Sequence, residues 1–457
     1  MVPITLLKLV ENNSFLSTLS SLYHSNGFEF YLVGGAVRDG ILDIPTNDFD
    51  FTTNATPEES IELLKKNNYK TTEVGKVFGT IELYDQERVV HITTFRKDTY
   101  ETDSRNPEIE KATDLITDLS RRDFTVNSIA YSLETNELID PFSGLKDLAS
   151  GTISTPDDPI ISFSDDPLRM LRVCRFVSTH GFSPDNETYI AMKENIERIK
   201  IITKERIRDE INKLLVGKSP SMGIRTLVES GLSLYIIPEI NELKIEVDPK
   251  HHHKDVYEHT LAVLDGVPPK LTLRMGALLH DIAKPNTKGI ENGKVHFRHH
   301  EVVGARMTKK ILKELKYDNK TIEDIVLLVE QHLRPHTFKM GWTDSAVRRY
   351  IVDAGHMLEE LNELVRADVT TKNKVKANEI YENLDEMEKR IEEVKAKEEL
   401  SKIRPALSGD EVMEHFNIQP GPKVGVIMKA LYEQRINDGE VSKEDALKLA
   451  EETYKNL

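Results

Sequence analysis

The pattern of apolar and polar positions divides the chain into two stretches of different character. Up to about residue 145, short apolar runs separated by turn residues alternate with helical stretches, which is typical of a mixed α/β fold. Four strands and one early helix are expected at Phe30–Val33, Asp48–Thr52, Thr80–Leu83, Val89–Thr93 and Pro57–Asn67. Beyond about residue 160 the strand signals fade and a helical period continues to the end, which predicts a mainly helical remainder.

Turn residues and charge subdivide the helical remainder. The segment Ile240–Lys250 predicts a boundary before a histidine-rich region, and Gly289–Lys294 predicts a turn-rich interruption between helices. The charged stretch Lys376–Lys402 is predicted to be an exposed helix or a helical hairpin. It keeps an apolar stripe at helical spacing, made of Ile380, Leu384, Met387, Ile391 and Val394. Pro405 and the Pro420–Pro422 turn punctuate a final small helical unit.

Composition narrows the class of protein. The 457 residues, 39% hydrophobic and 30% charged, suffice for two to four domains with a charged surface. Cys174 is the only cysteine, so an intramolecular disulfide and a cysteine metal site are excluded, as suits a reducing cytoplasm. No signal peptide is evident in Met1–Phe15, and no apolar run is long enough to span a bilayer. We therefore expect a cytoplasmic protein with no membrane association.

The net charge of −16 argues mildly against nucleic-acid binding, because phosphate contacts need lysine and arginine. The distribution of charge is uneven, however. Between Arg169 and Arg225 there are twelve Lys and Arg against seven Asp and Glu. This locally basic stretch fits an RNA-facing side. Ordinary charge on helix surfaces is an equally good interpretation at this point.

Two neighbouring N-terminal features point to phosphate chemistry. The expected strand Phe30–Val33 ends in Gly34 and Gly35, whose backbone N–H groups can approach a phosphate without a Cβ in the way. Asp48 and Asp50 alternate with apolar residues, as on a strand, so their carboxylates share one face. Two adjacent carboxylates suit Mg²⁺, which takes its remaining ligands from water and phosphate. A phosphate-binding turn beside a pair of metal-binding carboxylates is what a phosphoryl-transfer site needs.

Two further segments carry complementary chemistry. In the first, Arg121 and Arg122 can clamp a triphosphate, and Asp123 and Asn127 can bind a ribose hydroxyl or orient the arginines. A helix start capped by Asp123 is the alternative.

The second segment contains Ser164, which can cap a helix, and Pro167, which fits the first turn, so Asp166 and Arg169 share a face. An Asp acceptor beside an Arg donor complements the pairing edges of C and A and mismatches those of U and G. A surface salt bridge between these two residues is the alternative.

These motifs occur in an order that resembles the class II tRNA nucleotidyltransferases, that is, the CCA-adding enzymes and the bacterial-type poly(A) polymerases. The motifs are Gly-Gly-x-Val-Arg-Asp, Asp-x-Asp, Arg-Arg-Asp-Phe-Thr-x-Asn, Asp-Pro-Phe-x-Gly and an acidic-Asp-x-x-Arg helix. The resemblance is close over residues 28 to about 215. It implies an α/β nucleotidyltransferase head with a mixed sheet and helices, followed by a mainly α-helical neck, HD domain and tail.

The resemblance also implies roles for individual residues. Asp48 and Asp50 would bind the catalytic Mg²⁺, and Arg122 and Asp123 would contact phosphates and sugar as catalytic residues. Asp166 would read the base together with its neighbour Arg169. The other implied nucleotide-binding residues are Gly34, Gly35, Arg38, Arg121, Asn127 and Arg172. The segment Asp140–Gly144 resembles the flexible connection that lets the site switch from CTP to ATP, and Arg206 with Glu210 resembles a supporting arginine–glutamate pair.

The sequence departs from the family pattern at two positions. The base-reading motif begins Asp165-Asp166 where relatives usually have Glu-Asp, which leaves the reading pair intact. His91 stands where relatives often have Glu, so a third carboxylate is missing there. We do not count His91 among the catalytic residues at this stage.

Histidines concentrate in the second half of the chain. The adjacent His280 and Asp281 end the apolar helical run Leu271–Leu279, which places two polar groups against a core, as metal coordination would explain. The order of histidines and aspartates resembles the HD-domain metal-dependent phosphohydrolases. The resemblance implies metal ligands at His259, His280, Asp281 and Asp368, and a second metal or a substrate phosphate at His300 and His332. Such ligands suit Mn, Ni, Fe, Co or Zn equally. The internal run His251–His253 is assigned no role.

Together these observations predict an enzyme that adds CCA to the 3′ end of tRNA from CTP and ATP without a template. A second, HD-domain activity on RNA 3′ phosphates or cyclic phosphates is expected, and no obligatory protein partner. The expected domains are residues 1–148 (catalytic head), 149–245 (neck for base reading and RNA binding), 246–372 (HD domain) and 373–457 (tail contacting tRNA). The nearest alternatives are a poly(A) polymerase and a CC- or A-adding enzyme. An HD phosphodiesterase with an RNA-binding N-terminal module is a more distant one.

Overall fold

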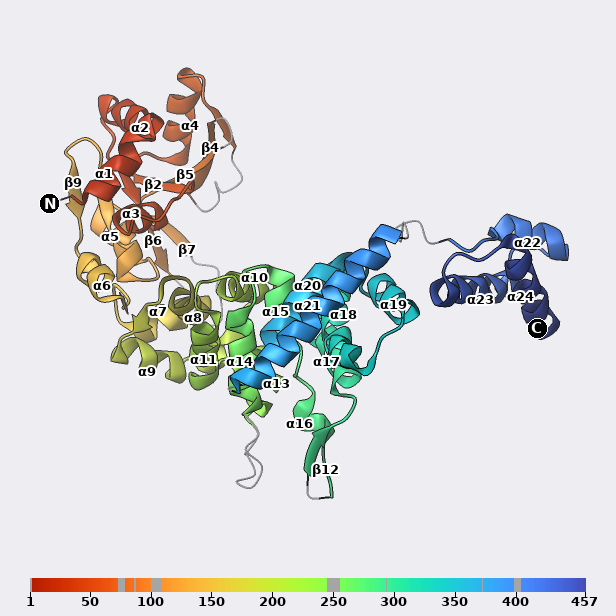
Figure 1. The fold of residues 1–457 in the computed structure, drawn as a ribbon. Helices are drawn as coiled ribbons and strands as arrows, with labels where there is room; N and C mark the ends of the chain where they lie inside the picture. The colour runs from red at the N-terminus through yellow and green to blue at the C-terminus, as the bar shows by residue number, and fades with distance from the viewer. Residues whose placement is uncertain are drawn as a thin grey trace. The chain divides into compact units, whose positions relative to one another are not determined.

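The computed structural model describes residues 2–72, 79–85, 88–99, 108–244, 255–292, 294–371, 373–397 and 404–457. These residues form two compact units that divide between Asn241 and Glu242 (Figure 1). The division falls inside the predicted boundary segment Ile240–Lys250, of which residues 245–250 lie outside the described residues, as does the run His251–His253. The four-domain division remains a prediction.

The first unit contains a sheet with the strand order β3-β4-β5-β2-β1-β8-β9. Neighbouring strands pair antiparallel except β2 and β5, which are parallel, so the sheet is mixed as predicted. Its strands are β1 (Phe30–Val33), β2 (Phe49–Thr53), β3 (Lys70–Thr72), β4 (Thr80–Asp85), β5 (Arg88–Thr94), β8 (Ala130–Ser132) and β9 (Glu137–Ile139). The predicted strands are confirmed, whereas β3, β8 and β9 were not predicted because three-residue strands have no periodicity to detect. Two short pairs lie apart from the sheet: β6 (Arg96–Thr99) with β7 (Glu108–Lys111), and β10 (Thr152–Ile153) with β11 (Ser183–Pro184).

Helices make up the rest of the first unit. They are α1 (Ile4–Glu11), α2 (Ser14–Ser25), α3 (Gly35–Ile41), α4 (Pro57–Lys66), α5 (Leu115–Ser120), η2 (Thr125–Asn127), α6 (Gly144–Ser150), α7 (Pro159–Asp165), α8 (Leu168–His180), α9 (Asn186–Glu194), η3 (Ile196–Ile201), α10 (Lys204–Leu215), α11 (Pro220–Glu229), α12 (Ser233–Ile236) and, at the division, α13 (Glu239–Glu242). The predicted helix at α4 starts with Pro57 after a capping box made by Thr56 and Glu59. The predicted cap at Ser164 is wrong: Ser164 lies within α7, and α8 begins after Pro167.

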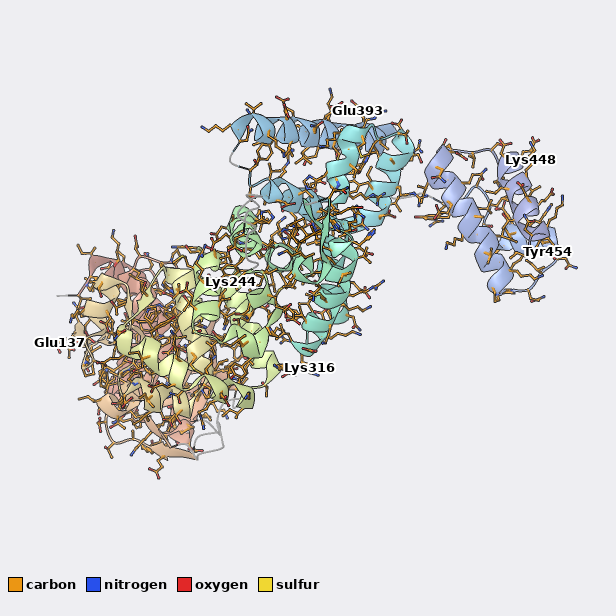
Figure 2. All side chains as sticks on the ribbon, turned by 90° about the horizontal axis from the view of Figure 1, so that it is seen from below. Glu137, Lys244, Lys316, Glu393, Lys448 and Tyr454 are labelled. Atoms are coloured by element: carbon orange, nitrogen blue, oxygen red, sulfur yellow. The ribbon has the colours of Figure 1, made fainter. Side chains whose placement is uncertain are left out.

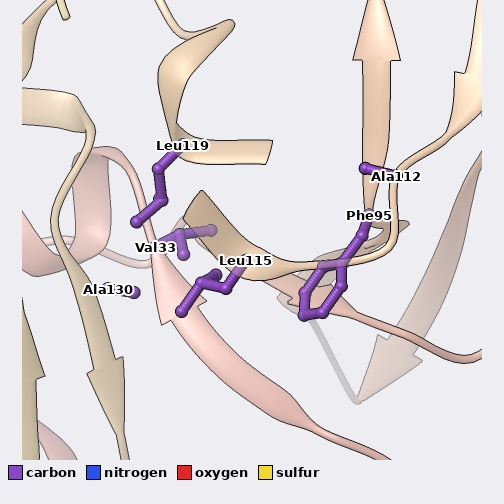
Figure 3. Close-up of a cluster of buried hydrophobic side chains, with 6 residues drawn as sticks. All are labelled: Val33, Phe95, Ala112, Leu115, Leu119 and Ala130. Carbon is purple, nitrogen blue, oxygen red and sulfur yellow. The ribbon is translucent and has the colours of Figure 1, made fainter. Parts of the chain in front are cut away.

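One cluster of buried apolar side chains fixes the end of β1 relative to α5. It consists of Val33, Phe95, Ala112, Leu115, Leu119 and Ala130 (Figure 3). Val33 is the last residue of β1, directly before Gly34, and α5 ends one residue before Arg121. Burial of one such aliphatic side chain stabilises the fold by about 1.5–3 kcal/mol. The cluster therefore holds the glycine turn and the arginine pair in a fixed relation.

The second unit is helical apart from one hairpin. Its elements are α14 (Val256–Gly266), α15 (Leu271–Leu279), α16 (Lys284–Thr287), β12 (Lys288–Glu291), β13 (Lys294–Phe297), α17 (His300–Glu314), α18 (Asn319–Gln331), η4 (Arg334–Met340), α19 (Asp344–Ala354), η5 (Gly355–Met357), α20 (Leu358–Asp368), α21 (Lys374–Lys397), α22 (Gly409–Phe416), α23 (Pro422–Asp438) and α24 (Lys443–Lys455). The predicted interruption between helices at Gly289–Lys294 is confirmed, since it falls between α16 and α17. It also contains a hairpin that was not predicted, in which β12 and β13 pair antiparallel.

The predicted helix in the charged stretch Lys376–Lys402 is confirmed as α21 as far as Lys397, and residues 398–402 lie outside the described residues. Leu384, Met387, Ile391 and Val394 of its apolar stripe are buried. The final small helical unit is also confirmed: α22, α23 and α24 share a core, and Tyr454, labelled with Lys448 in Figure 2, stacks on Phe416. Among the described residues, no helix combines the length and the apolar character needed to cross a membrane.

Candidate active site and metal centre

The glycine turn brings backbone and charged side chains unusually close together. Gly34 has a φ of +70°, which favours glycine, and α3 begins at the next residue. A Cβ on Gly34 would lie 3.2 Å from Nη1 of Arg122 and 3.5 Å from Oδ2 of Asp50. The turn therefore needs glycine for its backbone angle and for the approach of both side chains.

The carboxylate pair lies beside this turn. Asp50 is the second residue of β2 and Asp48 directly precedes the strand. Ligand atoms of Asp48, Asp50 and His91 lie within 4.8 Å of one another, so the predicted pair is brought together and a histidine joins it. Burial and the neighbouring Asp50 raise the pKa of Asp48, and the interaction with Asp50 raises the pKa of His91. A cation among these atoms would relieve the repulsion between the carboxylates, so the residues fit a divalent metal.

The arginine pair is held by an aspartate that sequence reasoning missed. Asp118 is fully buried on α5, and its Oδ1 accepts hydrogen bonds from Nε and Nη2 of Arg121 at 3.0 and 2.8 Å. Its Oδ2 accepts from Nη2 of Arg122 at 3.3 Å and from the Thr52 hydroxyl at 3.0 Å. Burial opposes ionisation, but the two guanidinium charges outweigh it and lower the pKa of Asp118. The arginine clamp is thus anchored to the sheet through one carboxylate.

Asp123 sits at the centre of a second network. It is buried and does not cap a helix; its carboxylate accepts from Nδ2 of Asn127 at 2.9 Å and pairs with Nη2 of Arg172 at 2.7 Å. Asn127 in turn accepts from Nη1 of Arg38 at 2.6 Å. Burial again opposes ionisation, and Arg172 and Asn127 lower the pKa of Asp123. The predicted sugar and phosphate residues therefore share one hydrogen-bonded chain.

Asp166 and Arg169 do not pair with each other in the described structure. Arg169 donates to the Ser162 hydroxyl at 2.6 Å and to the Arg121 carbonyl at 2.5 Å. Asp166 accepts from the Leu168 N–H at 3.2 Å and lies 3.4 Å from Nη2 of Arg206. The surface salt bridge considered as the alternative is therefore wrong.

Arg206 and Glu210, which the resemblance marks as a supporting pair, each contact another residue. Arg206 contacts Asp166, and Glu210 accepts from Nη1 of Arg175 at 3.1 Å. Both residues lie on α10, but their partners lie elsewhere: Asp166 directly follows α7, and Arg175 belongs to α8. Tertiary contacts have replaced the one-turn interaction that the spacing favours.

The Asp140–Gly144 segment forms a tight turn before α6. The carboxylate of Asp140 accepts from the N–H groups of Gly144 and Leu145 at 2.7 and 2.9 Å. A Cβ on Gly144 would lie 2.3 Å from the carbonyl oxygen of Thr125. The flexible switching role of this segment stays a prediction.

One cavity of about 330 Å³ gathers most of these groups. Ten predicted site residues line it: Gly34, Gly35, Asp50, Arg121, Arg122, Asp123, Asn127, Asp166, Arg169 and Arg172. The two remaining ones, Asp48 and Arg38, contact this set through Asp50 and Asn127. Its lining of guanidinium groups, carboxylates and glycine backbone suits a nucleoside triphosphate held with a metal.

The histidine-rich region forms a second, separate cluster in the second unit. Side-chain ligand atoms of His259, His280 and Asp368 lie within 4.8 Å of one another, and so do those of Asp281, His300 and His332. Asp281 faces both groups. Its Oδ2 lies 3.4 Å from Nε2 of His259 and 3.3 Å from Nε2 of His280, and its Oδ1 lies 3.2 Å from Nε2 of His300. All six predicted residues thus converge.

Contacts at Nδ1, on the side of each ring away from the cluster, fix the orientation of the histidines. Nδ1 of His280, His300 and His332 each lies 2.7–2.8 Å from a backbone carbonyl three residues earlier, and Nδ1 of His259 lies 2.7 Å from the Thr370 hydroxyl. A proton on Nδ1 leaves the lone pair of Nε2 pointing to the centre of the cluster. This is the arrangement that metal-ligating histidines need.

Unsatisfied buried atoms test the fit of a metal here. Within the described part of the chain, Oδ1 of Asp281 and Nε2 of His300 and His332 are buried without a hydrogen-bond partner. Burial lowers the pKa of His332 to about 3, which keeps its ring neutral. Despite burial, the histidines around Asp281 hold its pKa well below the usual range. A neutral imidazole beside an ionised carboxylate is a metal donor set, so the residues fit a divalent cation.

Sequence reasoning missed His336 at this cluster. Its Nε2 lies 3.3 Å from Oδ2 of Asp368, while Oδ1 of Asp368 lies 2.9 Å from Nε2 of His259. The spacing of His336 after His332 was the only available signal.

Comparison with known proteins gives the same order of domains along the chain. The model of the "Poly A polymerase head domain" matches residues 30–154, that of the "Probable RNA and SrmB- binding site of polymerase A" matches residues 181–244, and that of the "HD domain" matches residues 251–371. The CCA-adding enzyme of Geobacillus sp. (strain WCH70) is 30% identical over 417 residues, which cover 91% of this chain and 90% of that enzyme. The chain belongs to the tRNA nucleotidyltransferase family. The resemblance stated from the sequence motifs is thereby confirmed.

Two further comparisons extend this result. The A-adding tRNA nucleotidyltransferase of Deinococcus radiodurans is also 30% identical, over 88% of this chain and 91% of its own length. The crystal structure of the Bacillus stearothermophilus CCA-adding enzyme in complex with CTP has a TM-score of 0.69 at 24% identity and covers 96% of this chain and 97% of its own. The Thermotoga maritima CCA-adding enzyme complexed with tRNA has a TM-score of 0.59 at 19% identity, over 100% and 98% of the chains. The predicted fold of this tRNA nucleotidyltransferase is confirmed, and its head and HD domain are of metal-dependent types.

Proposed function

We propose that this tRNA nucleotidyltransferase completes the 3′ end of tRNA with C, C and A, using CTP and ATP and no nucleic-acid template. The observation that carries the proposal is the cavity in which the arginine clamp, Asp50 of the carboxylate pair, Asp166 and Arg169 meet. The CCA-adding enzyme of Geobacillus, which matches 91% of the chain, supports it. Because the reaction consumes tRNA and nucleoside triphosphates, we place it in the cytoplasm.

Each group of residues around the cavity would have its own role in nucleotidyl transfer. Arg121 and Arg122 would hold the β- and γ-phosphates and neutralise the charge that develops on the leaving pyrophosphate. The backbone of Gly34 and Gly35 would approach the phosphates from the other side. Asp48 and Asp50 would hold Mg²⁺, which supplies Lewis-acid chemistry at the α-phosphate when bound. The 3′ hydroxyl of tRNA attacks that phosphate in line with the departing pyrophosphate.

The reading of the base follows from two fixed side chains. The guanidinium of Arg169 is held by Ser162 and the Arg121 carbonyl, and the carboxylate of Asp166 is held by Arg206 and a backbone N–H. C and A both present an amino donor beside a ring-nitrogen acceptor, which matches an Asp acceptor beside an Arg donor. U and G present the opposite pattern and would leave both groups unpaired. This arrangement supports use of CTP and ATP only.

Addition of A alone is the second candidate, because the Deinococcus relative that matches 88% of the chain is an A-adding enzyme. The Asp166–Arg169 pair accepts C as well as A, which favours the complete sequence. A poly(A) polymerase would need the same pair to accept A and reject C.

The six-residue cluster in the second unit supports a phosphohydrolase activity of the HD domain. His259, His280, Asp281 and Asp368 would hold a divalent transition metal, and His300 and His332 would hold a second one or the substrate phosphate. Such a metal supplies an activated water and polarises the phosphate. RNA 3′ phosphates or 2′,3′-cyclic phosphates fit the proposal, because a blocked 3′ end cannot act as the nucleophile until the phosphate is removed.

The test is nucleotide addition by the full chain with Mg²⁺, a tRNA transcript that lacks its 3′ CCA, and each labelled nucleotide in turn. We expect incorporation of C and then A, with UTP and GTP rejected. Variants D48A and D50A should lose addition but keep the melting temperature and any HD activity, because both side chains are partly exposed. Retention of more than a few per cent of activity by both variants would contradict the metal assignment.

A further inference from the structure

His91 lies in a row of polar side chains that crosses three strands of the sheet. In the strand register, Asp50 of β2 is the partner of His91 of β5, and His91 is the partner of Glu82 of β4. Residues directly opposite one another in a sheet present their side chains on the same face. The sheet therefore lines up a carboxylate, an imidazole and a second carboxylate on the face that carries the transferase site.

We propose that His91 is the third protein ligand of the transferase metal. As a result, the preference of this site for Mn²⁺ or Co²⁺ over Mg²⁺ is greater than that of an all-carboxylate site. The proposal rests on the function proposed above and concerns the same site. It gives a role to His91, which the sequence motifs alone did not place among the catalytic residues.

The distances suit three ligands of one ion. Nδ1 of His91 lies 3.5 Å from Oδ1 of Asp50 and 3.6 Å from Oδ1 of Asp48. Two ligands about 2.1 Å from a common metal lie roughly 3.0–3.4 Å apart in octahedral or tetrahedral geometry. A closure of a few tenths of an ångström would bring these three atoms to ligand distances. The partial exposure of all three side chains leaves the remaining coordination positions open to water and phosphate.

Glu82 supports the ring from its far side. Its Oε1 lies 3.8 Å from Nε2 of His91, and its Oε2 accepts hydrogen bonds from the Thr72 and Tyr84 hydroxyls at 3.0 and 2.9 Å. A carboxylate behind a histidine favours the tautomer with a proton on Nε2 and a lone pair on Nδ1. At 3.8 Å Glu82 makes no direct hydrogen bond to the ring, but its negative charge on that side favours this tautomer, in which the lone pair of His91 faces Asp48 and Asp50.

The ligand set decides which metal is preferred. Mg²⁺ prefers oxygen ligands, whereas Mn²⁺ and Co²⁺ accept imidazole nitrogen, with affinity rising from Mn²⁺ to Co²⁺. An imidazolium that only balanced the acidic charge would instead be repelled when a cation arrives. Direct detection of the metal–nitrogen bond separates these two roles.

The experiment uses Mn²⁺ bound to the full chain, measured by pulsed electron paramagnetic resonance. The nitrogen coupling of a histidine ligand appears in the spectrum of the ion that it binds. The HD cluster also contains imidazoles, so the double variant D48N/D50N defines how much of the nitrogen coupling comes from the transferase site. H24A serves as the control, because His24 pairs with Glu134 away from that site. Equilibrium dialysis gives the number of Mn²⁺ bound per chain.

We expect the variant H91E to bind the same number of Mn²⁺ ions as the unmodified protein but to lose the nitrogen coupling that D48N/D50N also loses. Its ratio of Mn²⁺ to Mg²⁺ affinity should fall about tenfold, as should the ratio of addition rates with the two metals. H91A serves as a second variant should H91E melt at a lower temperature. If H91E and H91A both retain the coupling, the proposal is overturned while the transferase metal site stands. If D48N/D50N binds as much Mn²⁺ as the unmodified protein, the metal assignment of the proposed function itself is wrong.

Discussion

Substitution D118N tests how the arginine clamp is built. The carboxylate of Asp118 is fully buried and receives hydrogen bonds from both Arg121 and Arg122, with closest distances of 2.8 and 3.3 Å. Asparagine keeps the shape and one acceptor oxygen, but it removes the charge and turns an NH₂ group toward one of the guanidinium groups. Hydrogen bonds to charged groups contribute about 1.5–3 kcal/mol each, and removal of one partner of a buried pair costs about 3–5 kcal/mol. We expect D118N to lower the free energy of unfolding by about 3 kcal/mol.

The same substitution should weaken the reaction in a specific way. With the clamp no longer anchored, kcat/KM for CTP and for ATP should both fall about 100-fold, which corresponds to about 2.7 kcal/mol of transition-state stabilisation. Selectivity against UTP and GTP should stay unchanged, because Asp166 and Arg169 keep their own partners.

The assays are urea unfolding and steady-state addition to a tRNA transcript. D114N is the matched control, because Asp114 caps the start of the same helix and asparagine caps equally well. A D118N protein that is destabilised yet keeps the KM and kcat of the unmodified enzyme would refute the clamp argument.

Three further predictions concern other parts of the molecule. D166A should add C and A at least tenfold more slowly and lose discrimination against UTP and GTP, whereas D165A should keep it; equal slowing with all four nucleotides in single-turnover assays would contradict base reading. H280A should remove metal-dependent hydrolysis of RNA 3′ phosphates or cyclic phosphates and leave the rate of CCA addition within a few-fold of that of the unmodified protein. H299A is the control, because His299 is exposed. Loss of addition in folded H280A would contradict separate sites. G144A should destabilise the first unit by about 2–3 kcal/mol in thermal unfolding, because its Cβ would lie 2.3 Å from the Thr125 carbonyl oxygen. G425A places a Cβ in open space and should not destabilise the protein. Equal melting temperatures of the two variants would contradict this prediction.

Much of the transferase site could be predicted because its parts lie in short sequence motifs. The glycine turn and the Asp48–Asp50 alternation each predict a local geometry that the structure contains. Asp166 and Arg169 line the same cavity as predicted, although Asp166 precedes α8 and does not lie on it. What could not be predicted depends on contacts between distant segments. Arg206 and Glu210 lie one helical turn apart, and only the fold shows that they support Asp166 and Arg175.

The places of two residues at the candidate site were not predictable from local pattern. Asp118 resembles many other aspartates in a helix, and only its burial beneath Arg121 and Arg122 reveals its role. His91 meets Asp50 through the register of two parallel strands whose residues lie 41 positions apart, which no local period encodes. The HD cluster was predictable because the order of its histidines and aspartates resembles that of HD phosphohydrolases, although the place of His336 beside Asp368 needed the fold.

The most direct test of the proposed function is mass spectrometry of the tRNA product. Three transcripts that end before the CCA sequence, after the first C and after the second C are incubated with the full chain, CTP, ATP and Mg²⁺. The account predicts that all three converge on the mass of tRNA ending in CCA and are extended no further. Extension of only the third transcript, by a single A, or growth into a tail of many A residues, would contradict it.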